Sequence, residues 1–345
     1  MESWREARCV VAKVVGGNTG SKVRKKLALF FLIGWILLII GDRVDELRVY
    51  QGAQIAMYTI ALASIVLLTG YSGQVSLGNG AMMAVGGYAA ALTLNNLQTP
   101  IWSAFMMAIL VAALFGAFLG LAAARLSGPY LAGTTLALAV GLPAIANQFS
   151  FLGGEPGLLF DVGFPPERFG EDFTQYKWFF WIATFIALIA LFVTSNILQS
   201  RFGRTWRAIR GNSLAAELSG INASQLKVLA FSVSSGLAGL AGAVLAMTIS
   251  LVAPGAYTLA LSFALVTGAV LAGISSLPGV VLGGFILVAI PEIADALASS
   301  LGSEDKLNSY LPGLIVSVLL ILSVIYTPNG PGENLRKHFH KKSAH

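Results

Sequence analysis

The sequence predicts an all-α integral membrane protein, a bundle of about ten transmembrane helices. Hydrophobic residues make up 56% of the 345-residue chain and charged residues only 11%, and the mean hydropathy is +0.77. Apolar runs recur along the whole length, close to the ~20 residues that a helix needs to cross a bilayer. They lack the alternating ~10-residue pattern of membrane barrels, so helices are expected to form the spans.

Ten apolar runs are assigned as spans. The run after Ser76 and the run from Leu259 are short and rich in glycine, so each is also compatible with a re-entrant or broken helix. One membrane domain, residues 27–328, is expected between an N-terminal tail, 1–26, and a basic C-terminal tail, 329–345. The predicted spans are 27–41, 53–70, 80–96, 101–124, 131–149, 178–198, 228–250, 259–275, 278–298 and 311–327.

The first run is predicted to remain in the protein as a span. Basic residues at 22–26 precede it, but the small-residue cleavage pattern of a secretory signal does not follow it. The single cysteine, Cys9, lies in the polar tail and has no partner in the chain. An intrachain disulfide is therefore not expected.

Basic residues predict the orientation. They cluster at 22–26, in the loop 201–227 and in the C-terminal tail, and the positive-inside rule places all three clusters in the cytoplasm. An even number of spans permits this, and the acid-rich stretch 155–177 then lies outside. Because the net charge of +6 comes largely from residues beside spans, nucleic acid is not an expected partner.

The most distinctive membrane-embedded stretch is residues 70–80, GYSGQVSLGNG. Its glycines loosen a helix, and its polar side chains have no charged partner and would be costly against lipid. We predict that these side chains line the translocation pathway or a gate, with an ordinary interfacial turn as the alternative. They are Ser72, Gln74, Ser76 and Asn79.

Small residues predict tight packing of the helices. Several pairs stand four residues apart, the spacing that lets helix backbones approach closely in lipid. These pairs are Gly116 with Gly120, Ser235 with Gly239, and Gly279 with Gly283.

A polar loop, residues 201–227, interrupts the apolar pattern. Asn212 or Ser213 is suited to cap a short helix with residues 214–219 as its body, and Gly220 is suited to the left-handed position that ends it. A short cytosolic helix between two spans can fit a groove on a partner protein. We therefore predict that this helix docks on a partner.

The flanks of the short helix have separate expected roles. Asn222, with Gln225 three residues later, resembles a capping box at the start of the next span. Four arginines at intervals of three, from Arg201 to Arg210, spread over about half the circumference of a helix. We expect them to anchor the loop at the lipid headgroups rather than to form one stripe.

An enzyme is not predicted, and neither is a cofactor. All three histidines lie in the C-terminal tail, so a histidine-based triad or zinc site in the membrane is excluded. Residues 70–74 miss the nucleophile elbow because their fifth position is Gln. Residues 16–23 miss a phosphate loop because Ser21 replaces its second glycine.

An ion-coupled secondary carrier is the competing class of transporter. Such carriers bury acidic or histidine side chains inside the membrane, and the strong candidates here are Glu292 and Asp295. Both follow Pro291 near the predicted outer end of a span. An interfacial pair is therefore the favoured interpretation.

Three stretches resemble the LivM-like permeases of high-affinity branched-chain amino acid ABC importers. They are TGYSGQVSLGN at 69–79, RLSGPY at 125–130, and GRTWRAIR at 203–210 with the following Ala215, Ala216, Gly220 and Ile221. The resemblance extends over about residues 50–328. It implies a type II-like importer permease in a prokaryotic plasma membrane, with both termini in the cytoplasm.

The resemblance also implies partners. They are a second related permease, two cytosolic ATPase subunits that hydrolyse ATP, and an extracytoplasmic solute-binding protein. The family's loop motif implies a helix that couples to the ATPase, but Ser213 and Leu214 stand where family members usually carry an acidic residue. The implied coupling residues are Leu214, Ala215, Ala216 and Gly220.

The binding protein is expected on the outer loops, at a turn that contains Gly153, Gly154 and Glu155. The resemblance implies branched-chain or other neutral amino acids as the solute. Urea or another small polar solute is the alternative, because related permeases handle such solutes.

Overall fold

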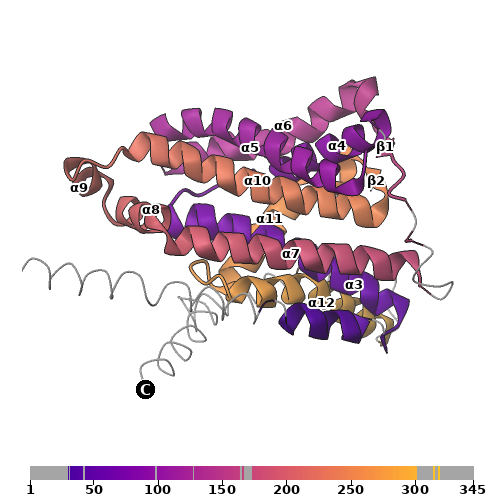
Figure 1. Cartoon of the computed structure of the whole chain (residues 1–345). Coiled ribbons are helices and arrows are strands. Elements are labelled where there is room, and N and C mark those ends of the chain that lie inside the picture. Colours follow the sequence, from indigo (N-terminus) through magenta and orange to yellow (C-terminus); the bar gives the residue numbers. More distant parts are fainter. Residues whose placement is uncertain are drawn as a thin grey trace, which may run out of the picture.

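Helices make up nearly all of the computed structural model (Figure 1). It describes residues 30–300 except 31, 42, 98, 127, 164 and 167–172, and it also describes positions 314 and 318. The predicted tails, 1–26 and 329–345, lie outside the described residues, as does the predicted span 311–327 apart from those two positions.

The long helices run back and forth between two ends of an elongated bundle (Figure 1). Within the described residues, six helical segments are long and apolar enough to cross a membrane. The long elements are α3 (Glu46–Ile65), which continues as the π-helix η1 (Val66–Tyr71), α4 (Asn79–Leu97), α5 (Ile101–Arg125), α6 (Pro129–Gln148), α7 (Gln175–Gln199), α10 (Ala223–Ile249), α11 (Leu259–Ala272) and α12 (Gly279–Ser300).

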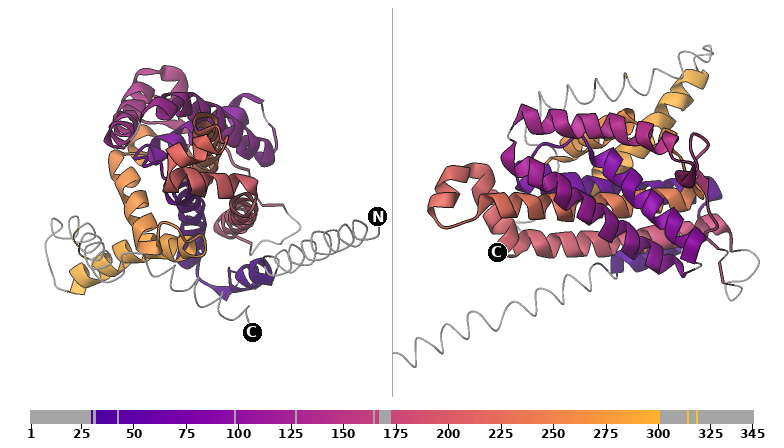
Figure 2. Two further views of the ribbon diagram at one scale, coloured as in Figure 1. Left: turned by 90° about the vertical axis from the view of Figure 1, so that its left-hand side faces the viewer. Right: turned by 90° about the horizontal axis from the view of Figure 1, so that it is seen from above.

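Short elements mark the two ends. Helices α8 (Arg201–Gly211) and α9 (Ser213–Leu218) project beyond the long helices at one end, which we call the α9 end (Figures 1 and 2). The opposite end, the ribbon end, carries an antiparallel pair of two-residue strands. Its elements are η2 (Ser150–Leu152), β1 (Leu158–Leu159), β2 (Leu251–Val252) and, after β2, the 3-10 turn η4 (Pro254–Ala256).

The predicted spans from 53–70 to 278–298 each coincide with a helix, and most boundaries differ by only a few residues. The first predicted span, 27–41, includes a shorter apolar helix, Leu32–Gly41. This helix packs along α7, because a side chain at Gly34 or Gly41 would press on Leu188 or Phe180. It runs antiparallel to α7, so its first turn is the one nearer the α9 end.

The centre of the bundle is α10, which packs against α3, α4 and α5. Its close contact with α5 requires glycine at two positions of α5. A Cβ at Gly116 would overlap Ser235, and a Cβ at Gly120 would lie 2.9 Å from the Cα of Val228. On α12, a Cβ at Gly283 would lie 2.7 Å from a methyl carbon of Leu62. The predicted small-residue packing is confirmed.

Candidate coupling surface and gate segment

Helix α8 begins where α7 stops at Ser200, whose side-chain oxygen accepts a hydrogen bond from the Phe202 amide at 3.2 Å. Its buried residues, Gly203, Trp206 and Ile209, recur every third position on one face. The Trp206 side chain is 1% exposed, and its Nε1 donates to the carbonyl oxygen of Leu226 at 2.9 Å. This contact attaches α8 to the first turn of α10.

The predicted caps of the short helix are confirmed. Asn212 Oδ1 accepts from the Ala215 amide at 3.0 Å, and Gly220 ends the turn with a φ of +83°. Asn222 Oδ1 then accepts from the Gln225 amide at 3.1 Å and starts α10. These local bonds hold α9 as an ordered projection although little of it is buried.

The predicted coupling residues divide between the surface and the interior. Leu214 is 67% exposed, whereas Ala216 is 5% exposed and packs in a small apolar cluster with Ile209 and Ala223. Leu218 is 84% exposed and was missed by the sequence analysis. Leu218 could have been predicted from the sequence, because it stands four residues after Leu214 and residues four apart share one face of a helix.

The 70–80 segment starts in the last two residues of η1, and residues 72–78 pass into the protein without helical structure before α4 begins at Asn79. All four predicted gate side chains are buried, with exposures from 3% to 5%. The backbone amides of Leu77 and Gly80 donate to the hydroxyls of Thr135 at 3.0 Å and Ser262 at 3.2 Å. Non-helical backbone is tolerated at membrane depth when protein groups satisfy it in this way.

The gate side chains bond to neighbouring elements. Gln74 Nε2 donates to Ser72 Oγ at 2.5 Å and to the carbonyl oxygen of Lys227 in α10 at 3.4 Å. Asn79 Nδ2 donates to Ser64 Oγ of α3 at 3.4 Å. Among the described residues, Gln74 Oε1 is buried and has no hydrogen-bond partner. The contact with a pathway or gate stays a prediction.

The headgroup anchoring of the four arginines stays a prediction, but two of them also contact the protein. All four are exposed, and Arg207 also places its guanidinium carbon 5.7 Å from the centre of the Tyr71 ring. Arg210 Nη1 donates to the carbonyl oxygen of Gly70 and, at 3.0 Å, to Ser275 Oγ. Arg207 and Arg210 therefore contact the protein rather than serving only as lipid anchors.

The predicted docking turn lies at the ribbon end. Gly153 and Gly154 have φ values of +85° and +60°, a region that favours glycine, and Glu155 is exposed. Just beyond the turn, Leu159 of β1 accepts a hydrogen bond from Asn95 Nδ2 of α4 at 3.0 Å. The length of the bundle separates this turn from α9 (Figure 1).

Of the two acidic residues weighed for ion coupling, Glu292 is exposed and accepts a hydrogen bond from Gln51 Nε2 near the start of α3 at 2.5 Å. The Asp295 side chain lies outside the described residues. Within the part of the chain that the structure describes, groups of three or more potential metal-ligating His, Cys, Asp or Glu side chains are absent.

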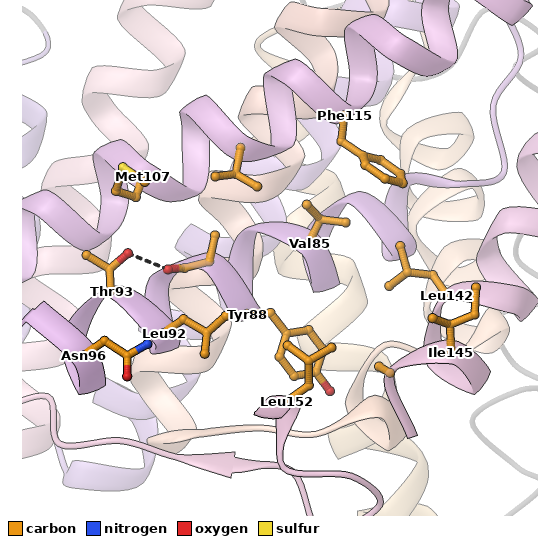
Figure 3. A pocket seen from close by; sticks show the side chains of 13 residues that line it. Val85, Tyr88, Leu92, Thr93, Asn96, Met107, Phe115, Leu142, Ile145 and Leu152 are labelled. Carbon is orange, nitrogen blue, oxygen red and sulfur yellow. Dashed lines mark hydrogen bonds between the residues drawn. The ribbon is translucent and has the colours of Figure 1, made fainter. Parts of the chain in front are cut away.

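An open cavity of about 550 Å³ lies between α4, α5 and α6 (Figure 3). Its wall is almost entirely aliphatic or aromatic, with side chains from all three helices. The Tyr88 hydroxyl is buried without a hydrogen-bond partner among the described residues. Representative wall residues are Val85, Tyr88, Leu92, Met107, Phe115, Leu142 and Leu152.

Residues 50–324 match the family model described as "Branched-chain amino acid transport system / permease component". The chain belongs to this permease family. With several apolar helices, it is a multi-pass membrane protein. Solved structures gave no match.

Individual relatives extend the comparison. The high-affinity branched-chain amino acid transport system permease protein LivM of Escherichia coli K12 is 27% identical over 90% of this chain and 76% of its own length. LivH of the same strain is 28% identical over 77% of this chain and 89% of its own. The ribose import permease protein RbsC of Haemophilus influenzae is 25% identical over 89% of this chain and 92% of its own.

Proposed function

We propose that this chain is one permease subunit of an ATP-driven importer for branched-chain or other neutral amino acids. The family match carries this proposal, because it covers residues 50–324 and thus nearly all of the bundle. The chain itself is proposed to form part of the translocation pathway and not to hydrolyse ATP. Its partners are a second related permease, two ATPase subunits and a solute-binding protein.

The two ends of the bundle differ in their surface features, and this supports a different partner at each end. Exposed leucines on α9 offer an apolar contact of the kind that lies in a groove of another protein. We assign this contact, formed by Leu214, Ala215 and Leu218, to a cytosolic ATPase. The turn at Gly153 to Glu155, at the opposite end, is assigned to the binding protein outside.

The charge pattern supports the same orientation. Helix α8 carries four arginines, and the positive-inside rule then puts the α9 end in the cytoplasm of a prokaryotic cell. Helix Leu32–Gly41 also starts from that side, since Gly34 faces Leu188 and Gly41 faces Phe180 of α7. Ten spans, including 27–41 and 311–327, bring both termini to the cytoplasm in a type II-like permease.

The solute assignment rests on the relatives' names and on the apolar cavity. A cavity of about 550 Å³ lined mainly by apolar side chains fits a branched aliphatic group better than it fits urea. The match to a ribose permease shows that relatives of this chain differ in solute. Competition between solutes therefore has to decide the assignment.

The test is uptake of radiolabelled leucine by proteoliposomes that contain the whole complex with its binding protein. We expect uptake to require ATP and the binding protein, and we expect valine and isoleucine, but not urea, to compete. Uptake driven by a proton or sodium gradient without ATP would favour the secondary carrier instead. Competition by urea alone would favour the small polar solute.

A further inference from the structure

Arg210 bonds to the broken end of α3. Helix α3 ends in the π-helix η1, and a helix terminus leaves carbonyl oxygens without an intrahelical partner. Arg210 Nη1 donates to one such oxygen, that of Gly70. The side-chain stem of Arg210 packs on Gly73, where a Cβ would lie 2.8 Å from Arg210 Cγ.

The same guanidinium also reaches the turn between α11 and α12. Arg210 Nη1 donates to Ser275 Oγ at 3.0 Å. The turn already touches the end of α3, because a Cβ at Gly70 would overlap the carbonyl oxygen of Ile274. One side chain of α8 therefore bonds to a backbone oxygen at the end of α3 and to a hydroxyl of the turn that joins α11 to α12.

Two neighbouring contacts hold α8 in place beside the Arg210 junction, which is the contact of Arg210 with Gly70 and Ser275. Trp206 fixes α8 to α10 through its bond to Leu226, and Arg207 lies over the ring of Tyr71, the last residue of η1. A movement of α8 cannot leave Gly70 and Ser275 in place without breaking charge-assisted hydrogen bonds, which are roughly twice as strong as neutral ones.

We infer that Arg210 is the positioning residue through which movement of α8 and α9 shifts the 70–80 segment and the α11–α12 turn. The inference rests on the proposed function, in which a partner ATPase moves α9. It assigns a route within this chain: α9 to α8, Arg210 to Gly70, and from there to the side chains of Ser72 and Gln74.

The experiment compares Arg210→Gln with Arg204→Gln in the whole complex reconstituted with its binding protein. Both changes remove one exposed arginine from α8. Arg204 donates to the nearby carbonyl oxygen of Gln199 at 3.3 Å, whereas Arg210 reaches the end of α3 and the α11–α12 turn. The readout is leucine taken up per ATP hydrolysed. We expect this ratio to fall about tenfold or more in Arg210→Gln, the size of losing a hydrogen bond to a charged group, and to stay unchanged in Arg204→Gln.

Arg210→Lys is the second variant, because it keeps the charge but replaces the planar fork with a compact ammonium. An uptake-per-ATP ratio for Arg210→Lys that lies below the wild-type value and above the Arg210→Gln value supports the inference. A wild-type ratio in either Arg210 variant overturns it, and Arg210→Lys decides if Arg210→Gln does not assemble. If the wild-type complex itself shows no ATP-dependent uptake, the proposed function fails and the inference fails with it.

Discussion

At the scale of single residues, a few polar contacts hold the projecting helices on the bundle. Trp206 is the clearest, since its indole is buried and donates to the carbonyl oxygen of Leu226. The indole N–H adds a hydrogen bond to the contacts that its apolar rings make. The order of α8 thus depends on one hydrogen bond in addition to packing.

Replacement of Trp206 by Phe is expected to lower the free energy of unfolding by about 1 kcal/mol, the net value of one hydrogen bond. Denaturant titration in detergent, followed by circular dichroism, measures it. Trp102→Phe is the matched control, because Trp102 is 48% exposed. Equal losses in the two variants would contradict the role given to the indole donor.

A second prediction at this scale concerns Gly242 of α10, where a Cβ would overlap the backbone of Met83 in α4. Gly242→Ala is expected to destabilise the protein by about 2 kcal/mol, since overpacking typically costs 1–3 kcal/mol. Gly141→Ala, on α6, has open space around its Cβ and is expected to be neutral or stabilising. The same denaturant titration compares the two variants. An unchanged free energy of unfolding for Gly242→Ala would contradict the tight packing of α4 on α10.

At the scale of elements, α9 is short but strongly specified by its ends. Asn212 caps its start, Gly220 ends it, and Ala216 alone among its residues is buried. The exposed leucines at 214 and 218 are therefore held in a fixed direction. This arrangement suits a helix that transmits force by contact with a partner.

Leu218→Lys is expected to weaken binding of the proposed ATPase subunits by about tenfold or more, because it places a charge in an apolar contact. Ser213→Asp is the control, since a carboxylate in the first turn of a helix is favourable. Co-purification of the ATPase with the permease measures both. Retention of the ATPase by Leu218→Lys at the wild-type level would contradict the assignment of this contact to α9.

Sequence alone predicted most elements because each has a local signal. Apolar runs marked the helices, and Asn212, Gly220 and Asn222 marked the turns of the loop. The roles of Arg207 and Arg210 were missed, because their contacts at Tyr71, Gly70 and Ser275 join residues far apart in the chain. Burial of the 70–80 segment followed from its polar residues, but its bonding partners did not.

At the scale of the whole molecule, the two ends of the bundle are proposed to bind two different partners. The α9 end carries the arginines of α8 and the exposed leucines of α9, and the ribbon end carries the turn at Gly153 to Glu155. The Arg210 junction joins the α9 end to the broken helix ends at Gly70 and Ser275. A chain inserted in the opposite direction could not use these contacts as proposed.

The most direct test is the side of the membrane on which each end lies. Because Cys9 is the single cysteine, a Cys9→Ser chain carrying Ala215→Cys or Glu155→Cys can be labelled with a membrane-impermeant maleimide. We predict that the thiol at 215 reacts only in inside-out vesicles and the thiol at 155 only in right-side-out vesicles. Labelling of position 215 from the outside, or of both positions from one side, would contradict the account.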